Sequence, residues 1–462
     1  MNKAKAFFER LRGKKVAFIG IGVSHERLIP MFSDYGASVT LCDRKKSIDD
    51  FPEYKEMLIE KNIGLHLGED YLKDIDADII FRTPGMYYNN PILQEYRKKN
   101  VVVTSEMELF FELCPAKIFA VTGSDGKTTT TTLISEFLGR ENKVYKGGNI
   151  GKALLPDVLS MTENDIAVVE LSSFQLISMR RSPDVAVVTN VAPNHLDVHK
   201  SMDEYIDAKR NLLLHQSPFS EAILNLDNDI TVSMAKDVRG KTLWFSRKSE
   251  VERGTYLKDG YICYKNGDVS ERLFKAEEIK IPGVHNVENY LTAIAATYEH
   301  IKDKSIFADV AREFGGVEHR IEFVRELDGV KFYNDSIASS PTRTIAGLNS
   351  FKDKVILIAG GYDKLVPYDE LGPKINEKVK VLILCGPTGA KIEKAVLSAE
   401  GEKPKILKSD NMETSVRLAF RNAEKGDTVI LSPASASFDA YKNFEVRGRD
   451  FKRIVSLLKG KE

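Results

Sequence analysis

Short runs of apolar, mostly β-branched residues alternate along this chain with longer segments whose apolar positions recur at spacings of three and four. Runs of the first kind indicate buried strands and segments of the second kind indicate amphipathic helices. Their regular alternation is typical of α/β architecture built on parallel sheets. Strands are predicted over residues 15–22, 38–43, 77–85, 165–171, 184–191, 354–361, 379–386 and 427–435.

The pattern restarts twice, so three consecutive α/β domains are expected. A Rossmann-like N-terminal domain is predicted over 1–114, a central P-loop ATPase-like domain with a parallel sheet over 115–317, and a Rossmann-like C-terminal domain over 318–462. Glycine-interrupted polar residues at 242–269 predict hairpins, and hence an extra small sheet in the central domain. The length of 462 residues agrees with roughly 100–200 residues per domain.

Composition excludes several classes of protein. Lysine plus arginine and aspartate plus glutamate number 67 each, which gives no net charge to attract nucleic acid or a membrane surface. The four cysteines form no C-x-x-C pair, so neither a disulfide framework nor a zinc site is indicated. No apolar run approaches membrane-spanning length, and the charged N-terminus does not resemble a signal peptide. We expect a cytoplasmic monomer with small-molecule partners, no nucleic acid and no membrane insertion.

The segment FAVTGSDGKTTTTTLISEF is nearly a phosphate-binding loop, although Val121 stands where the strict motif has glycine. Gly123 and Gly126 let the backbone turn its N–H groups toward an anion at the start of a helix. Lys127 can reach the outer phosphates of ATP, and the hydroxyl of Thr128 can bind Mg²⁺. The plain alternative is a glycine-rich turn capped by threonine.

Three further polar residues follow predicted strands or lie on a helix. Glu170 ends the strand in VVELSSFQL, His195 lies in TNVAPNHLDVH, and Lys209 lies on the helix YIDAKRNLL. Each has an ordinary interpretation: a solvated carboxylate, a structural histidine and a surface lysine. Glu170 could equally belong to a metal site beside the phosphate loop, whereas for His195 and Lys209 taken alone the ordinary interpretation is favoured.

The loop without its leading glycine, together with these motifs, resembles the Mur ligase superfamily, which includes the folylpolyglutamate synthetases. The resemblance implies catalysis by Lys127, Glu170, His195 and Lys209, with two Mg²⁺ ions. It implies that Glu170 and Thr128 hold Mg²⁺, and that His195 and a carbamylated Lys209 hold the second ion. The implied ATP-binding residues are Gly123, Ser124, Asp125, Gly126, Lys127, Thr128, Thr129, Asn286, Asn289, His319, Arg320 and Asp335.

The N-terminal segment GIGVSHER is a weak dinucleotide fingerprint, because His25 replaces the third glycine of G-x-G-x-x-G. A nicotinamide oxidoreductase is therefore disfavoured. The layout resembles the UDP-binding domain of the D-glutamate-adding branch of the superfamily, whereas folylpolyglutamate synthetases lack such a domain. The implied UDP-substrate residues are Val23, Ser24, Asp43, Arg44, Thr83 and Asn149.

Four C-terminal motifs resemble the same branch: VEHRIEFV, YNDSIASSPTRT, GGYDK and SPASASFDAYKNFEVRG. Two residues depart from its pattern, since Ile337 stands where lysine is common and Asn194 where an acidic residue is frequent. The Asn-Pro-Arg tripeptide expected of a diamino-acid-adding relative is absent from the sequence. The implied D-glutamate residues are Ser339, Lys364, Ser437, Phe438 and Phe444.

The expected activity is ATP-dependent amide synthesis that joins D-glutamate to UDP-N-acetylmuramoyl-L-alanine in peptidoglycan synthesis. A carboxylate acylates poorly, so phosphoryl transfer first converts it into an acyl phosphate, which an amine then attacks. The alternatives are the same chemistry with another acceptor, such as L-lysine or a folate-type substrate, and an ATP-binding module without catalysis.

Overall fold

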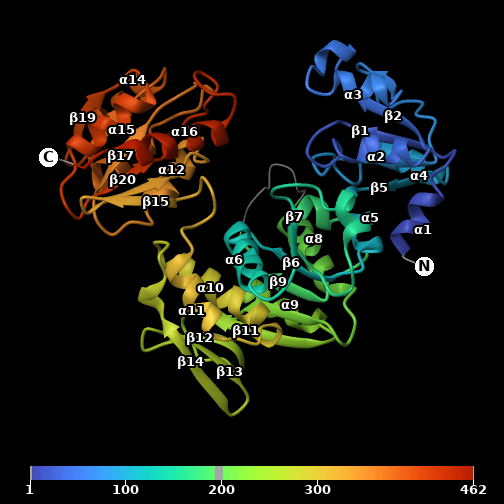
Figure 1. Cartoon of the computed structure of the whole chain (residues 1–462), viewed down its shortest axis with the longest axis horizontal. Helices are drawn as coiled ribbons and strands as arrows, with labels where there is room; N and C mark the ends of the chain where they lie inside the picture. Colours follow the sequence, from blue (N-terminus) through green and yellow to red (C-terminus); the bar gives the residue numbers. More distant parts are fainter. Residues whose placement is uncertain (1–2, 193–200, 461–462) are drawn as a thin grey trace. The chain divides into compact units, whose positions relative to one another are not determined.

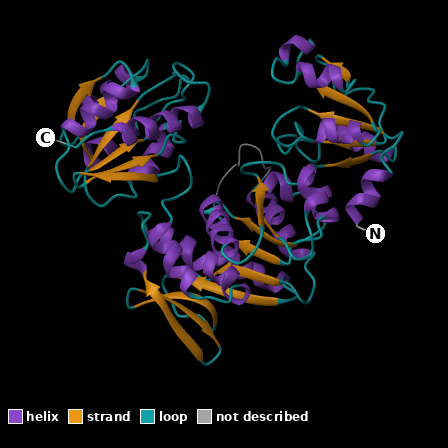
Figure 2. Ribbon diagram, in the orientation of Figure 1, coloured by secondary structure: helices purple, strands orange, loops and turns teal. Residues whose placement is uncertain are grey.

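A computed structural model describes residues 3–192 and 201–460, and contains three sheets with helices packed along them (Figures 1 and 2). The chain divides into two compact units, Met1–Ala276 with Glu288–Ala308, and Glu277–Val287 with Asp309–Glu462. Each unit is described by itself. Within the described ranges, none of the helices has the length and apolar character needed to cross a membrane.

The first unit begins with a five-stranded parallel sheet of order β3-β2-β1-β4-β5. Strand order changes direction at β1, where a ligand crevice forms in sheets of this type. The strands are β1 (Lys15–Ile19), β2 (Ser38–Asp43), β3 (Gly64–Leu67), β4 (Ile79–Phe81) and β5 (Val102–Thr104). The helices are α1 (Lys3–Glu9), α2 (Leu28–Asp34), η1 (Ile48–Asp50), α3 (Lys55–Glu60), α4 (Pro91–Lys98) and α5 (Glu106–Leu113).

A nine-stranded sheet of order β14-β13-β12-β11-β10-β9-β6-β8-β7 completes the first unit. Its strands are β6 (Lys117–Thr122), β7 (Val144–Gly148), β8 (Ile166–Glu170), β9 (Val185–Val188), β10 (Glu221–Asn225), β11 (Lys241–Ser246), β12 (Arg253–Lys258), β13 (Tyr261–Asn266) and β14 (Val269–Lys275). Its helices are α6 (Lys127–Gly139), η2 (Leu155–Ser160), α7 (Ser173–Leu176), α8 (Met202–Leu214), α9 (Asp229–Met234) and η3 (Ala235–Asp237). The helical elements that follow along the chain are η4 (Ala276–Glu278), α10 (Val284–Thr297), η5 (Tyr298–His300) and α11 (Ser305–Glu313).

The predicted hairpins lie at the edge of this sheet. We expected them to form an additional small sheet, whereas β12 pairs in parallel with β11, so β12, β13 and β14 continue the central sheet. The parallel part of the sheet agrees with the sequence pattern: every residue of β8 and β9 is buried. Helix α6 covers it with the apolar positions read from the sequence, Leu133, Ile134, Phe137 and Leu138, all buried.

The second unit is built on a six-stranded sheet of order β15-β16-β20-β17-β18-β19, in which only β15 is antiparallel. Its strands are β15 (Glu322–Leu327), β16 (Val330–Asn334), β17 (Val355–Ala359), β18 (Val379–Leu384), β19 (Lys405–Lys408) and β20 (Thr428–Leu431). Its helices are α12 (Pro341–Leu348), α13 (Leu371–Lys378), α14 (Gly389–Ser398), α15 (Met412–Arg421) and α16 (Phe444–Leu457). Three strands predicted from apolar runs are confirmed here as β17, β18 and β20.

Candidate active site

The ends of β8, β6 and β9 meet at one edge of the central sheet. These strands are neighbours and parallel, and Val121 of β6 pairs with Glu170 of β8. The carboxyl end of β6 leads into the phosphate-type loop and α6, Glu170 ends β8, and Thr189 follows β9. Parallel strands thus place the loop, the acidic residue and the start of the TNVAPNHLDVH motif side by side.

Two glycines of the loop have no room for a side chain. Gly123 has φ +152°, and a Cβ added to it would lie 1.9 Å from Thr189 Oγ1. Gly126 has φ +78°, and its Cβ would lie 2.4 Å from Asn289 Oδ1. Because both glycines keep the loop tight against its neighbours, α6 begins at Lys127 immediately beyond a left-handed turn. This is the strand–loop–helix arrangement that binds phosphate.

Residues outside the motif anchor the loop. The hydroxyl of Ser124 donates to the carbonyl of Ala192 at 2.9 Å and lies 3.0 Å from the Tyr205 hydroxyl. The hydroxyl of Thr189 donates to the carbonyl of Asp125 at 2.6 Å. Sequence reasoning assigned no role to Thr189 or Tyr205. Tyr205 precedes Lys209 by one turn of α8, and this four-residue spacing is a signal that could have found it.

Two lysines converge on the loop. Lys127 Nζ donates to the carbonyls of Gly123 and Ser124, both at 3.0 Å. Lys209 Nζ donates to the same Gly123 carbonyl at 2.8 Å and to Thr122 Oγ1 at 3.4 Å. Two amino groups at one carbonyl create a strongly electropositive point beside the loop, as an anion site requires.

Lys209 is not the surface lysine of the ordinary interpretation. It is 1% exposed, and no carboxylate of a described residue lies within ion-pair distance of it. Burial and the charge of Lys127 lower the pKa of Lys209 to about 7, while Asp125 opposes this shift. A substantial fraction of neutral amine is therefore present at neutral pH, which is the form that can react with an electrophile.

Glu170 is likewise fully buried, at 1% exposure. Its Oε1 accepts a hydrogen bond from Asn149 Nδ2 at 2.9 Å, whereas its Oε2 has no hydrogen-bond partner among the described residues. A buried carboxylate oxygen without a partner is costly, so this atom suits a cation. Thr128 lies half-buried at the start of α6. His195 and Asn194 lie outside the described residues. Within the described ranges, no cluster of three or more His, Cys, Asp or Glu residues could hold a metal.

Of the two asparagines that the resemblance implies for ATP binding, Asn289 contacts the phosphate loop. Its Oδ1 accepts a hydrogen bond from Thr130 at 3.3 Å, and its position limits Gly126 as described above. Asn286 belongs to the other compact unit, where its Nδ2 donates to the carbonyl of Pro282 at 2.6 Å. Both side chains are buried.

Five of the six predicted UDP-substrate residues lie at or just beyond the carboxyl ends of β1, β2 and β4 in the first sheet: Val23, Ser24, Asp43, Arg44 and Thr83. The sixth, Asn149, follows β7 of the central sheet and donates to Glu170 there. A Cβ on Gly20, whose φ is +75°, would lie 3.4 Å from Thr83 Cγ2 and 3.9 Å from Asp43 Oδ2, so these residues lie together. His25 closes the same turn, because its Nδ1 lies 2.9 Å from the Gly20 carbonyl and its ring packs against Phe18. Burial lowers the pKa of His25 to about 4, so it is a neutral part of the core. Val23 and Arg44 are exposed, and Ser24 is half-buried.

In the second unit, His319 and Asp335 are buried and Arg320 is exposed. Asn334 Nδ2 donates to His319 Nδ1 at 2.9 Å. Asp335 accepts from the hydroxyl of Ser432 at 2.7 Å, and burial raises the pKa of Asp335 to about 7. His319 and Arg320 precede β15, and Asp335 follows β16. Because β15 is antiparallel to β16, the start of β15 lies beside the carboxyl end of β16.

Two of the residues expected to bind D-glutamate lie together and are exposed. Lys364 Nζ is 5.9 Å from the centroid of the Phe438 ring. Ser437 is buried next to Phe438, and Phe444 packs edge-on against His319 with centroids 5.9 Å apart. Ser339 is half-buried before α12.

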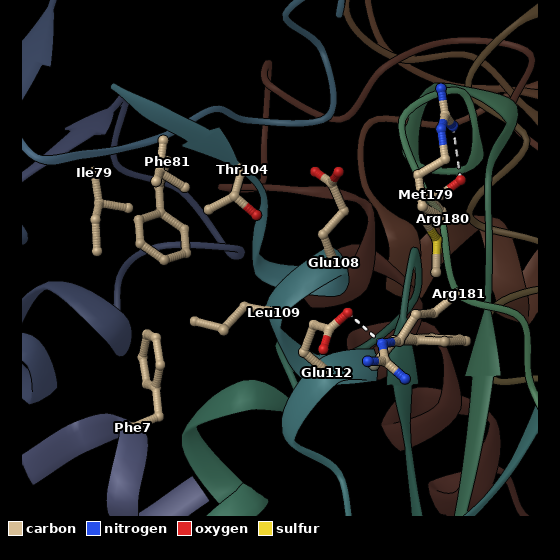
Figure 3. Close-up of a pocket in the computed structure, with 12 residues that line it drawn as sticks. Phe7, Ile79, Phe81, Thr104, Glu108, Leu109, Glu112, Met179, Arg180 and Arg181 are labelled. Atoms are coloured by element: carbon tan, nitrogen blue, oxygen red, sulfur yellow. Dashed lines mark hydrogen bonds and ion pairs between the residues drawn. The ribbon is translucent and has the colours of Figure 1, made fainter. Parts of the chain in front are cut away.

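A pocket of about 290 Å³ in the first unit is shown in Figure 3. The side chains of Phe7, Phe81 and Leu109 form an apolar wall, and Glu112 points to Arg181, with which it forms an ion pair. None of the residues predicted to bind ATP, the UDP substrate or D-glutamate lines this pocket.

Two family models identify the class of protein to which this chain is similar. Residues 121–297 match the family described as Mur ligase middle domain, and residues 319–435 match Mur ligase, glutamate ligase domain. Solved structures share the fold at low sequence identity. A UDP-N-acetylmuramate-alanine ligase from Thermotoga maritima is 18% identical with a TM-score of 0.57, covering 96% of this chain and 99% of that one. MurF from Acinetobacter baumannii is 14% identical with a TM-score of 0.58, covering 98% of each chain.

Relatives with higher sequence identity identify the particular family within this class. The UDP-N-acetylmuramoylalanine--D-glutamate ligase of Acetivibrio thermocellus is 53% identical over 99% of both chains. The ligase of the same name from Ruminiclostridium cellulolyticum is 48% identical over 99% of this chain and 100% of its own. The chain therefore belongs to the UDP-N-acetylmuramoylalanine--D-glutamate ligase family of Mur ligases.

Proposed function

We propose that the chain joins D-glutamate to UDP-N-acetylmuramoylalanine at the edge of the central sheet, with ATP as the energy source. The activity is that of an ATP-dependent ligase of peptidoglycan synthesis. It is supported by relatives named UDP-N-acetylmuramoylalanine--D-glutamate ligase that match nearly the whole chain, and by the two Mur ligase domains. The observation that carries the assignment of this edge is the buried pair of Glu170 and Lys209 on either side of the phosphate loop. The names of the relatives give no support to L-lysine as the acceptor.

The reaction begins with the carboxylate of the muramoyl-alanine substrate. One of its oxygens attacks the γ-phosphorus of ATP, so a P–O bond forms and ADP leaves. The loop N–H groups and Lys127 bind the phosphates and offset the charge that accumulates as two anions approach. The amine of D-glutamate then attacks the acyl carbon, loses a proton and expels phosphate. In this proposal Lys127 exchanges its bonds to Gly123 and Ser124 for phosphate oxygens.

Glu170, Thr128, Lys209 and His195 are the proposed Mg²⁺ ligands. The partnerless Oε2 of Glu170 fits this role. Mg²⁺ would supply charge neutralisation between the phosphates and the attacking carboxylate. Lys209 fits only as a carbamate, because an ammonium group cannot bind a cation. Its neutral amine would attack CO₂, form an N–C bond and lose a proton, which converts a cation into a carboxylate-like anion.

The UDP moiety and D-glutamate are assigned to the carboxyl edges of the other two sheets. We assign the UDP moiety to the turn around Gly20, and D-glutamate to the loops that carry Lys364 and Phe438. A cation and exposed backbone N–H groups suit the two carboxylates of D-glutamate. The division into domains 1–114, 115–317 and 318–462, a monomeric state and a cytoplasmic location are part of the same proposal.

Isotope transfer tests the mechanism. The UDP-N-acetylmuramoylalanine carboxylate is labelled with ¹⁸O and incubated with ATP, Mg²⁺ and D-glutamate. One labelled oxygen is expected in the released phosphate, because the P–O bond formed with the substrate is retained when the amine displaces phosphate. Label found in AMP, or product formed without labelled phosphate, would contradict the acyl-phosphate route.

A further inference from the structure

A buried arginine lies beneath the loops of the second unit. Arg447 on α16 is 3% exposed. Its Nε donates to Ser336 Oγ at 3.0 Å, and its Nη2 donates to the carbonyls of Ser336 at 2.9 Å and Ser435 at 3.1 Å. Its Nη1 donates to the carbonyl of Ala436 at 3.0 Å. One planar guanidinium thus holds the loop after β16 to the loop after β20.

The loop after β17 joins the same centre. The carbonyl of Ala436 also accepts the N–H of Tyr362 at 3.0 Å. Gly361 leaves no space there, because an added Cβ would lie 2.3 Å from that carbonyl and 3.2 Å from Arg447 Nη1. The N–H of Gly361 donates to Thr388 Oγ1, which lies 2.8 Å from Ser435 Oγ. Three loops are therefore fixed to one another through the acceptors of Arg447.

Arg447 has no ion-pair partner among the described residues, since its hydrogen bonds all go to carbonyls and one hydroxyl. Burial lowers the pKa of Arg447 to about 10, so the side chain still carries its charge at neutral pH. Burial of an unpaired charge is costly. The planar fork, which can serve several acceptors at once, explains why arginine occupies this position.

The three loops carry Ser339, Lys364 and Ser437, and Ser336 reaches one residue more, because its hydroxyl donates to the carbonyl of Phe444 at 2.8 Å. We propose that Arg447 is a positioning residue for the amino-acid substrate, which holds these three loops in register and so sets the affinity for D-glutamate. This inference rests on the proposed assignment of D-glutamate to these loops.

The test compares the full-length enzyme with Arg447→Lys, Arg447→Met and Ser336→Ala. Ser336→Ala removes the acceptor of Nε and the link to Phe444 while leaving the charge in place. Arg325→Met is the matched control, because Arg325 likewise donates to two backbone carbonyls of the second unit, those of Val455 (3.1 Å) and Ser456 (2.8 Å) in α16. KM values for D-glutamate, ATP and UDP-N-acetylmuramoylalanine are measured with the thermal unfolding temperature of each protein.

Arg447→Lys is expected to raise the KM for D-glutamate about 10-fold, and Ser336→Ala about 3-fold, as loss of charge-assisted and neutral hydrogen bonds suggests. The KM values for the other two substrates stay within about 2-fold, and Arg325→Met changes none of the three. An unchanged KM for D-glutamate in folded Arg447→Lys and Ser336→Ala would overturn the inference and leave the proposed function intact. A wild-type enzyme that does not use D-glutamate would overturn both.

Discussion

The phosphate loop of the central sheet and the loop cluster of the second unit both contain a buried cation beneath glycine turns, yet they use it differently. At the phosphate loop the proposed metal ligands Glu170 and Lys209 are themselves buried, and the pKa of Lys209 is lowered to about 7 by burial and by Lys127. In the loop cluster Lys364 and Phe438 are exposed, and the buried Arg447 stays charged and only supports them. A site for phosphoryl transfer needs preorganised, desolvated groups, whereas a site for amino-acid entry needs accessible ones.

This comparison predicts the largest loss at the phosphate loop. Glu170→Gln keeps the shape and the acceptor for Asn149 but removes the charge of the partnerless oxygen. We expect kcat to fall by about 100-fold or more, as for loss of one strong electrostatic contact to the transition state. Glu163→Gln is the control, because Glu163 is an exposed residue just before β8, and it should leave kcat unchanged. Steady-state phosphate release measures both. A kcat for Glu170→Gln within a few-fold of wild type would remove Glu170 from the mechanism.

The phosphate loop is expected to depend on pH through Lys209. The pKa of Lys209 is lowered to about 7, so the amine is increasingly protonated as the pH falls below that value. Only the neutral amine forms a carbamate. The carbonyl signal of ¹³CO₂ bound to the protein, followed by NMR, is therefore expected above about pH 7 and lost below it, together with activity. Lys209→Met should lack the signal at every pH. A full signal in Lys209→Met would show that the carbamate forms elsewhere.

The exposed side of the comparison predicts a smaller effect on binding. Lys364→Met should raise the KM for D-glutamate about 10-fold, because one solvent-accessible charge-assisted contact is lost. The KM for ATP should not change. Lys354→Met is the control. Lys354 precedes β17, whereas Lys364 follows it, and Lys354 forms an ion pair with Glu402. Equal effects of the two substitutions on D-glutamate would contradict a specific role for Lys364.

The smallest effect is expected at Arg320, which is exposed beside the buried Asp335. Arg320→Ala should raise the KM for ATP about 3-fold to 10-fold, as for a single solvent-screened charge. Binding of the UDP substrate, measured by calorimetry, should stay the same. Unchanged ATP kinetics would show that Arg320 does not contact the nucleotide.

Local patterns were sufficient for the strands with long apolar runs, for α6 and for the phosphate-type loop. Short strands such as β3, β5, β7 and β19 were not predicted. The apolar run before Gly123 and the spacing after Lys127 determine one strand–loop–helix unit, which the structure confirms. The pairing of β12 with β11 could not be read in the same way, because hydrogen bonding between strands is a tertiary property. For Glu170 and Lys209 the sequence left a solvated position and a metal site both open, and their burial is evident only once the ends of β6, β8 and β9 are brought together.

The residues that support the two sites could not be predicted from local sequence patterns either. Arg447 lies 111 positions from Ser336, and their hydrogen bond exists only after the sheet has brought both loops together. Tyr205 differs, because its four-residue spacing from Lys209 was visible on a predicted helix. The roles carried over by resemblance, including the D-glutamate residues and the metal ligands, stay predictions. His195 stays one as well.

The proposed function requires that this chain adds D-glutamate, and not another amino acid, to UDP-N-acetylmuramoylalanine. One competition measures it directly: the enzyme receives ATP, Mg²⁺, the UDP substrate and an equimolar mixture of ¹⁵N-labelled D-glutamate, unlabelled L-glutamate and L-lysine. Mass spectrometry of the product then distinguishes the three amino acids. The expected product is heavier by one labelled glutamyl residue, with one phosphate released per product. A product carrying unlabelled glutamate or lysine would contradict the proposed function.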